Sequence, residues 1–313
     1  MISRFALYVA ISILSSAVLA AAVPQERASS TATPVNMVVT VEARHGYDTP
    51  VVNREDVMVY EGHDRDKVTD WIPAQGEHGG LDLFILIDDS SNVSLGSQIE
   101  DIRQFISSQP ATTKIGVAYM QNGTAKILQT LSSDHAEAAT ALRLPLGLAG
   151  VNGSPYFSLS DLIKHWPESG DRREVLMVSD GIDRYWGSGP DDPYVRSSVE
   201  QSQRAGVVVF AIYTLGVGHY GHSFWRILWG QNYLSQIADE TGGESYYLGS
   251  YGAPVSFVPY LDEVSHRLNH QYLLTFLAKP EKKAGMQRVR LTTEVPNVEL
   301  VSADSVYVPA GSD

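Results

Sequence analysis

Two kinds of hydrophobic pattern divide the chain. Across about residues 80–269, short runs that are apolar at nearly every position alternate with segments in which apolar residues recur at helical spacing. The apolar runs read LDLFILI, KIGVAYM, EVLMV and GVVVFAIY. Strands that are buried on both faces and separated by helices are typical of a doubly wound, mostly parallel sheet with helices on both faces. The middle of the chain is therefore predicted to be an α/β domain.

The two ends of the chain show a different pattern. Residues 35–79 and 270–313 contain short runs that roughly alternate between apolar and polar positions and are separated by turn residues. Such runs favour half-buried strands. Neither end could cover its own apolar face, so we expect the two ends to pair into one small β-sandwich-like unit.

The start of the chain predicts export. Residues 1–22 place Arg4 before an apolar run and end in small residues, which is the pattern of a cleaved secretory signal peptide. A retained anchor helix is the alternative, although serines dilute the run. Residues 23–34 are polar and bounded by proline, as in a flexible tether. No later run reaches the ~18 apolar residues of a membrane span, so we expect a periplasmic or extracellular protein that does not insert into a membrane.

Composition excludes several classes of function. The 313 residues include no cysteine, which excludes disulfides, a thiol nucleophile and a zinc–thiolate site. The formal net charge of −13 argues against nucleic acid or an anionic bilayer as a partner. The nucleophile elbow of serine hydrolases, G-x-S-x-G, does not occur. Metal ions and cationic partners suit this composition better, and we expect a protein that is not an enzyme.

A polar cluster, DDSSN, ends the first apolar run of the α/β domain. In doubly wound sheets, ligands bind beyond the carboxyl ends of the strands. Ser97 and Glu100 form a plausible capping box for the next helix, so the cluster is not needed as its cap. Asp88, Ser90 and Asn92 could then turn oxygen-bearing side chains toward one point, as hard cations such as Mg2+ require.

Two more polar residues are predicted to lie near this edge. Asp180 follows the run EVLMVS and precedes Gly181, which places a second carboxylate at a strand end, although alone it would more often be a turn residue. Ser154 precedes Pro155 and a helical run, where the alternative interpretation is a helix N-cap with proline at the first helical position.

These segments resemble a von Willebrand factor type A domain. The resemblance rests on FILIDDSSN, Ser154 in NGSPYFSLSDLI, VLMVSDG and LSQIADETGGESYYL, and the flanking segments are similar to exported bacterial proteins of the related type. It implies a metal-ion-dependent adhesion site, Asp-x-Ser-x-Ser with a distant Thr and Asp, that holds Mg2+, Mn2+ or Ca2+. By this resemblance Asp88, Ser90 and Asp180 match the pattern, whereas Asn92 replaces a serine and Ser154 replaces the usual threonine.

The resulting functional prediction is an exported binding module. A divalent ion would accept an acidic side chain from a protein partner, and the surrounding loops would supply the specificity. One alternative is a structural protein with the same fold and no metal, which Asn92 favours. Another is a nucleotide-binding enzyme, since GVGHYG from Gly216 to Gly221 matches G-x-G-x-x-G. That fingerprint needs a second strand ending in an acidic residue, and the sequence predicts a helix there instead.

Aromatic residues mark the predicted partner-binding face. The loops after EVLMVS and GVVVFAIY should both emerge at the carboxyl edge of the sheet. Tyrosine and tryptophan dominate the hot spots of protein interfaces. The predicted partner-binding residues are Tyr185, Trp186, Tyr194 and Tyr220. For Phe224, Trp225 and Trp229, packing onto the domain as a short helix is the equal alternative.

Overall fold

The computed structural model describes residues 32–45, 48–148, 150, 152–187, 189–279, 281 and 283–311, without the side chains of 219 and 220. The predicted signal peptide and residues 23–31 of the predicted tether lie outside the described residues. The first strand, β1, begins at Thr33, within the segment predicted to be the end of the tether.

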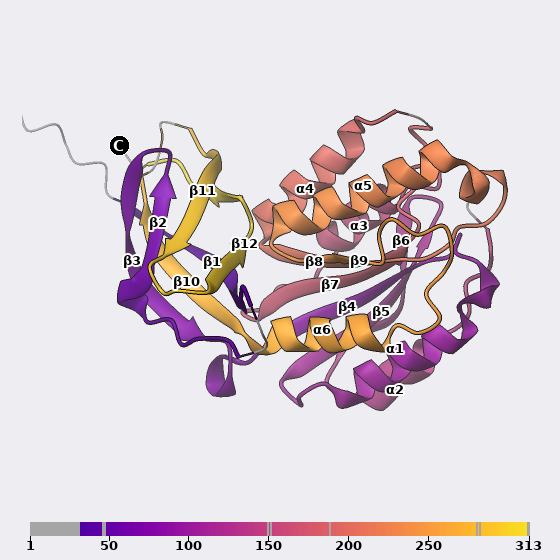
Figure 1. Cartoon of the computed structure of the whole chain (residues 1–313), viewed down its shortest axis with the longest axis horizontal. Helices are drawn as coiled ribbons and strands as arrows, with labels where there is room; N and C mark the ends of the chain where they lie inside the picture. Colours follow the sequence, from indigo (N-terminus) through magenta and orange to yellow (C-terminus); the bar gives the residue numbers. More distant parts are fainter. Residues whose placement is uncertain are drawn as a thin grey trace, which may run out of the picture.

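The α/β domain contains a six-stranded sheet in the order β6-β5-β4-β7-β8-β9 (Figure 1). Its strands are β4 (Leu81–Asp88), β5 (Thr113–Gln121), β6 (Thr124–Ser132), β7 (Arg172–Ser179), β8 (Val207–Tyr213) and β9 (Ser245–Tyr246). Neighbouring strands are parallel except at one edge, where β6 runs antiparallel to β5. The predicted doubly wound, mostly parallel sheet is confirmed.

Helices cover both faces of this sheet (Figure 1). On one face lie α1 (Gly96–Ser108), α2 (His135–Ala141) and α6 (Val258–Asn269). On the other face lie α3 (Pro155–Lys164), α4 (Pro193–Ala205) and α5 (Phe224–Thr241). None of the described helices is both long enough and apolar enough to cross a membrane.

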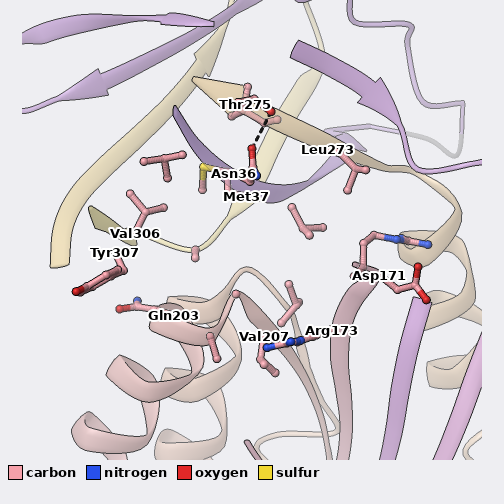
Figure 2. Close-up of a pocket in the computed structure, with 18 of the residues that line it drawn as sticks. Asn36, Met37, Asp171, Arg173, Gln203, Val207, Leu273, Thr275, Val306 and Tyr307 are labelled. Atoms are coloured by element: carbon pink, nitrogen blue, oxygen red, sulfur yellow. Dashed lines mark hydrogen bonds between the residues drawn. The ribbon is translucent and has the colours of Figure 1, made fainter. Parts of the chain in front are cut away.

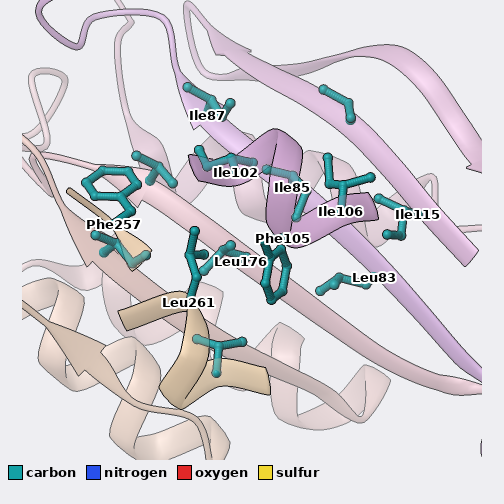
Figure 3. Close-up of a cluster of buried hydrophobic side chains, with 14 of the residues drawn as sticks. Leu83, Ile85, Ile87, Ile102, Phe105, Ile106, Ile115, Leu176, Phe257 and Leu261 are labelled. Carbon is teal, nitrogen blue, oxygen red and sulfur yellow. The ribbon is translucent and has the colours of Figure 1, made fainter. Parts of the chain in front are cut away.

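The central strand β4 is buried along its whole length. Because side chains alternate along a strand, Leu83, Ile85 and Ile87 enter the cluster formed with α1 and α6 (Figure 3), whereas Phe84 and Leu86 pack on the opposite face. A slip of one residue would exchange these two sets of differently shaped side chains, so close packing on both faces fixes the register of the strand. It thereby fixes which polar residues emerge at the carboxyl end of β4.

Both ends of the chain contribute to a second, antiparallel sheet, as predicted. Its strand order is β12-β1-β10-β3-β2-β11-β13, and it curls into a half-barrel around its own apolar core. The strands are β1 (Thr33–Ala43), β2 (Val57–Glu61), β3 (Asp64–Pro73), β10 (Gln271–Ala278), β11 (Gly285–Thr293), β12 (Val298–Ser302) and β13 (Ser305–Val308). The strand β10 pairs on both sides with N-terminal strands, β1 and β3. Each end therefore depends on the other for its hydrogen bonds and core.

A cleft of about 670 Å³ separates the half-barrel from the amino ends of β7 and β8 (Figure 2). Met37 and Leu273 lie on the half-barrel side, and Arg173 and Val207 lie on the α/β side. The two units are joined beside it by polar contacts, among them the Gln203 amide bonded to the Asp304 carboxylate at 2.7 Å. This cleft lies at the opposite end of the parallel strands from the predicted binding site.

Candidate binding site at the carboxyl edge of the parallel sheet

Asp88 forms a compact polar centre where β4 ends. Its Oδ1 accepts hydrogen bonds from the backbone N–H and the hydroxyl of Ser90, at 2.8 and 2.6 Å. Its Oδ2 accepts a hydrogen bond from the hydroxyl of Ser179, the last residue of the neighbouring strand β7, at 2.7 Å. All three residues are buried. The Asp88 carboxylate is thus satisfied by three neutral donors.

Asp180, which follows β7, is paired with Arg184, which was not among the residues predicted to form the site. The guanidinium Nη1 donates to Asp180 Oδ1 at 3.2 Å, and Nη2 donates to Oδ2. The Asp180 side chain is 1% exposed and the Arg184 side chain is 5% exposed. Burial raises the pKa of Asp180, and Arg184 beside it opposes that rise. This is a buried, bidentate ion pair. Asp88, Ser90, Ser154, Asp180 and Arg184 together form what we call the edge site.

The local backbone explains why Arg184 returns to Asp180. Gly181 has a φ of +67°, and a Cβ built there would lie 2.2 Å from the Gly230 carbonyl oxygen on α5, so only glycine fits this turn. The backbone N–H of Arg184 then donates to the Gly153 carbonyl at 2.9 Å. The turn and this hydrogen bond hold Arg184 over the carboxylate.

The loop after β8 closes over the ion pair. A Cβ at Gly216 would lie 1.7 Å from Asp180 Oδ2 and 2.9 Å from Arg184 Nη2, so the backbone of this loop touches both partners. The next residue, Val217, donates its N–H to the Ser90 carbonyl at 3.1 Å. The pair is therefore enclosed between the ends of β4, β7 and β8.

The same contacts explain the glycines of the G-x-G-x-x-G match. Gly216 is required by its approach to Asp180, and a Cβ at Gly221 would lie 2.4 Å from the Gly216 carbonyl oxygen. Close backbone packing therefore accounts for Gly216 and Gly221 without a bound nucleotide.

Ser154 lies beside this centre but acts as a helix cap. It is the N-cap of α3, with proline at the first helical position, and its hydroxyl oxygen accepts from the Phe157 N–H at 3.3 Å. The hydroxyl donates to Asp183 Oδ2 at 2.6 Å. The alternative interpretation of Ser154 as an N-cap is thus correct, and both functions of its hydroxyl are in use.

Asn92 caps a short helix that follows the edge site. Its Oδ1 accepts from the Ser94 N–H at 2.9 Å and caps the short 3-10 helix η3 (Val93–Leu95). The predicted capping box of Ser97 and Glu100 is wrong, because α1 begins at Gly96 directly after η3, and its N-cap, Leu95, has no side-chain cap. The amide oxygen of Asn92 is therefore already used as a cap within the chain.

As placed, the five residues predicted to bind metal do not fit a hydrated divalent ion. Mg2+ demands near-octahedral oxygen ligands and keeps several waters. Both Asp180 oxygens face Arg184, Ser154 is bonded to Asp183, and Asn92 caps η3. The cavity that remains beside Asp88 and Arg184 has about 10 Å³, room for one water at most. Within the described residues, no three His, Asp or Glu side chains are arranged to hold a metal ion.

A second aspartate of the DDSSN cluster, Asp89, has a separate role. Arg143 donates from Nη1 and Nη2 to the two Asp89 oxygens, at 2.6 and 2.7 Å. The N–H of Leu146 donates to Asp89 Oδ1, and the N–H of Leu148 donates to the Asp89 carbonyl, both at 3.1 Å. Burial raises the pKa of Asp89, but hydrogen bonds from Arg143 and Gln121 outweigh it and hold the pKa below its usual value. Asp89 thus anchors the loop that follows α2.

This anchored loop exposes three leucines. We call residues 144–148 the leucine loop, after Leu144, Leu146 and Leu148, which are all exposed. Val93 on η3 is also exposed, and it lies beside this loop. A Cβ built on Gly147 would be 3.9 Å from Val93 Cγ1 and 3.8 Å from Val217 Cγ1. Exposed apolar side chains are therefore gathered on two neighbouring segments at the rim of the edge site.

The predicted aromatic face is partly formed. Tyr185 and Trp186 are exposed, and Tyr194 is half-buried against them and Phe157, with ring centroids between 4.6 and 6.0 Å apart. The side chain of Tyr220 lies outside the described part of the structure. Tyr185 and Trp186 directly follow Arg184 in the sequence, at the same edge of the sheet.

The three aromatics at the start of α5 divide between the two alternatives. All three belong to this 18-residue helix, which is longer than the short helix considered from sequence. Phe224 and Trp225 are exposed, whereas Trp229 packs against the apolar cluster of that face. Exposed aromatic side chains thus occur after both β7 and β8.

No family profile matches the chain, and a comparison with curated proteins finds no match either. Among solved structures, an aerotolerance-related membrane protein from Bacteroides fragilis is 14% identical, with a TM-score of 0.45, over 61% of this chain and 99% of that one. The von Willebrand factor type A protein from Catenulispora acidiphila is 10% identical, with a TM-score of 0.43, over 92% and 76%. The ArnB paralog VWA2 from Sulfolobus acidocaldarius is 9% identical, with a TM-score of 0.38, over 88% and 76%.

At these identities and TM-scores the likeness is one of fold alone. The strand order and the helices on both faces come from the coordinates of this chain. They place Asp88 and Asp180 at the carboxyl edge, where the sequence resemblance expected them. The α/β domain has the doubly wound fold that the resemblance to von Willebrand factor type A domains implied.

Proposed function

We propose that this chain is an exported, non-enzymatic module that binds a protein partner at the carboxyl edge of its parallel sheet. The observation that carries the proposal is the group of exposed apolar side chains at that edge, on the leucine loop and at Val93 beside it. Single exposed apolar residues are normal on protein surfaces, but contiguous apolar patches mark interaction sites. A protein surface is the partner class that an open aliphatic patch suits.

The leucine loop is held ready for binding. Its backbone is tied to Asp89 through the N–H groups of Leu146 and Leu148, and Arg143 pairs with the same carboxylate. A loop that is already ordered costs less conformational entropy when a partner binds. The polar contacts beneath the loop therefore support an apolar surface above it.

The aromatic residues extend the proposed face. Trp186 is 44% exposed, and its indole N–H donates to the Asp191 carbonyl at 3.1 Å, which fixes the ring. Rigid, partly exposed tryptophan and tyrosine side chains supply large contact areas at low entropic cost. Tyr185 and Trp186 thus provide anchors beside the aliphatic patch.

This form of recognition needs no ion. Burial of the patch would supply affinity of about 25 cal/mol per Å² of apolar surface before the costs of association. The more specific prediction, an acidic side chain of the partner bound to Mg2+ in the edge site, stays a prediction that requires Arg184 to leave Asp180. The apolar patch supports the coarser proposal without that step.

The proposal is tested by removing the apolar patch while leaving the anchoring contacts in place. Partners captured from the extracytoplasmic protein fraction of the source organism are identified, purified and titrated against the native chain. The double substitution Leu146→Ser and Leu148→Ser keeps both backbone N–H groups. It should weaken binding at least tenfold, that is by about 1.4 kcal/mol or more.

The control is Val51→Ser, since Val51 is an aliphatic residue at least as exposed as the two leucines but outside the carboxyl edge, in the segment between β1 and β2. This control should bind as the native chain does. Equal affinity of the leucine variant and the control would show that the patch does not contact the partner.

Export is tested separately. The N-terminus of the chain recovered from cell fractions is determined by mass spectrometry. Cleavage near residue 22 with recovery outside the cytoplasm supports export, whereas an intact Met1 in the cytoplasmic fraction contradicts it.

A further inference from the structure

We infer that Arg184 is the resident cation of the edge site, so that the chain keeps the layout of a metal-ion-dependent adhesion site but neutralises it with its own guanidinium. The inference concerns how the carboxylates are compensated, and it stands whether or not the proposed partner binds. It rests on the charge balance of the site, on the space within it, and on the separate uses of Asn92 and Ser154.

Groups of this chain already compensate the carboxylates of Asp88 and Asp180, so no divalent ion is needed. Asp180 receives both guanidinium nitrogens of Arg184 and the Ile182 N–H at 2.9 Å. Asp88 receives the two donors of Ser90 and the hydroxyl of Ser179. A buried carboxylate is tolerated when it is paired or fully hydrogen-bonded, and both carboxylates meet that condition with groups of this chain.

The space in the site is already filled. The remaining cavity of about 10 Å³ is lined by Asp88, Ser90, Ser154 and Arg184, and one water at most would occupy it. The Gly216 backbone lies directly against the Asp180–Arg184 pair, where even a Cβ would collide with both side chains. An ion that keeps several waters would have to displace both the guanidinium and this loop.

The two positions that depart from the family pattern have other uses. Asn92 caps η3 with the oxygen that would have been its ligand atom. The Ser154 hydroxyl donates to Asp183, whose other oxygen accepts the N–H groups of Tyr185 and Trp186 at 2.8 Å each. Ser154 and Asp183 therefore hold the aromatic turn that follows Arg184. At both positions, Asn92 and Ser154, the side chain predicted to bind metal instead stabilises the backbone around the ion pair.

The inference predicts that the native chain does not respond to divalent ions. A site with a Kd of about 0.1 mM would raise the melting temperature by roughly 5–10 °C at about 10 mM metal, because ligand binding stabilises by mass action. We expect a shift below about 1 °C with Mg2+ or Mn2+, and no change with a chelator. Mn2+ electron paramagnetic resonance measures binding directly, without dependence on stability.

Two variants make the test specific. In Asp180→Asn, any metal bound at the edge site should be lost, while metal bound elsewhere should remain. In Arg184→Gln, the edge site loses its cation, so saturable Mn2+ binding that appears only in this variant would support the inference. Saturable Mn2+ binding by the native chain that Asp180→Asn abolishes would overturn it. If Arg184→Gln does not fold, the comparison of the native chain with Asp180→Asn still decides the question.

Discussion

Two aspartate–arginine pairs lie at the same edge of the sheet and differ in what they do. Asp180 and Arg184 are both buried, with 1% and 5% of their side chains exposed, and they close the centre of the site. Asp89 is equally buried, but Arg143 is 31% exposed and lies under the leucine loop. Both pairs have the same bidentate geometry. The Asp180–Arg184 pair closes the edge site, whereas the Asp89–Arg143 pair holds a loop at the surface. What differs is whether the guanidinium reaches solvent.

The largest expected effect comes from breaking the sealed pair. Arg184→Gln leaves Asp180 buried without its cation, and removal of one partner of a buried ion pair costs about 3–5 kcal/mol. Urea denaturation measures the loss. The double variant Arg184→Gln with Asp180→Asn removes both charges and should recover a large part of it. A loss below about 1 kcal/mol in the single variant would show that the pair is not sealed from water.

A smaller effect is expected from the half-exposed pair. Arg143→Gln removes a charged donor from Asp89, but Gln121 and the Leu146 N–H remain, so a loss of about 1.5–3 kcal/mol is expected. Hydrogen exchange should show faster opening of residues 144–148. If the loop stays protected, its order does not depend on Arg143.

The contributions of Asp89 and Asp180 to stability should change with pH in opposite directions. The pKa of Asp89 is lowered in the folded chain, so its stabilisation is present above the unfolded value of 3.8 and is lost as the pH falls through the folded pKa. The pKa of Asp180 is raised by burial, so its contribution is present below 3.8 and is lost as the pH rises through the folded pKa. In Asp89→Asn, the unfolding free energy should therefore fall less steeply as the pH is lowered. In Asp180→Asn, it should fall more steeply. Identical slopes in the two variants would contradict this assignment.

The smallest effect on stability is expected at the exposed aromatic turn after Arg184. Trp186→Ala should change the unfolding free energy by less than about 1 kcal/mol. It should nevertheless weaken partner binding about tenfold, since exposed tryptophan is a frequent hot spot. Unchanged binding would place the partner on the leucine loop alone, and an unfolded variant would show that Trp186 is structural.

Much of the fold could be predicted because burial leaves a strong signal in the sequence. The run LDLFILI is apolar on both faces because β4 is buried on both faces. The two ends share a sheet because neither has enough strands to bury its own apolar side chains. The positions of Asp88 and Asp180 followed from the strand ends, since polar residues after a buried strand must emerge at its edge.

The partners of those aspartates could not be predicted in the same way. The return of Arg184 to Asp180 depends on the turn at Gly181, and the sequence SDGIDR does not reveal which way the guanidinium points. An arginine four residues after the aspartate of an Asp-Gly pair is the signal that could have indicated it. The role of Asn92 was missed because η3 moves the start of the next helix away from the expected capping box. Side-chain direction in loops depends on neighbours that are distant in sequence.

The pairing of β3 with β10 has a consequence for how the chain folds. Pro73 and Tyr272 are register partners, although nearly two hundred residues separate them. Closing so long a loop in an unfolded chain carries a large entropic cost and slows folding. Once the α/β domain has formed, β4 begins eight residues after Pro73, and α6 ends at Asn269, three residues before Tyr272. The Gln75 amide bonds to the Asn269 carbonyl at 2.9 Å, so a folded α/β domain already holds the two strands side by side. We therefore expect the half-barrel to assemble last, using the α/β domain as the template that aligns its two halves.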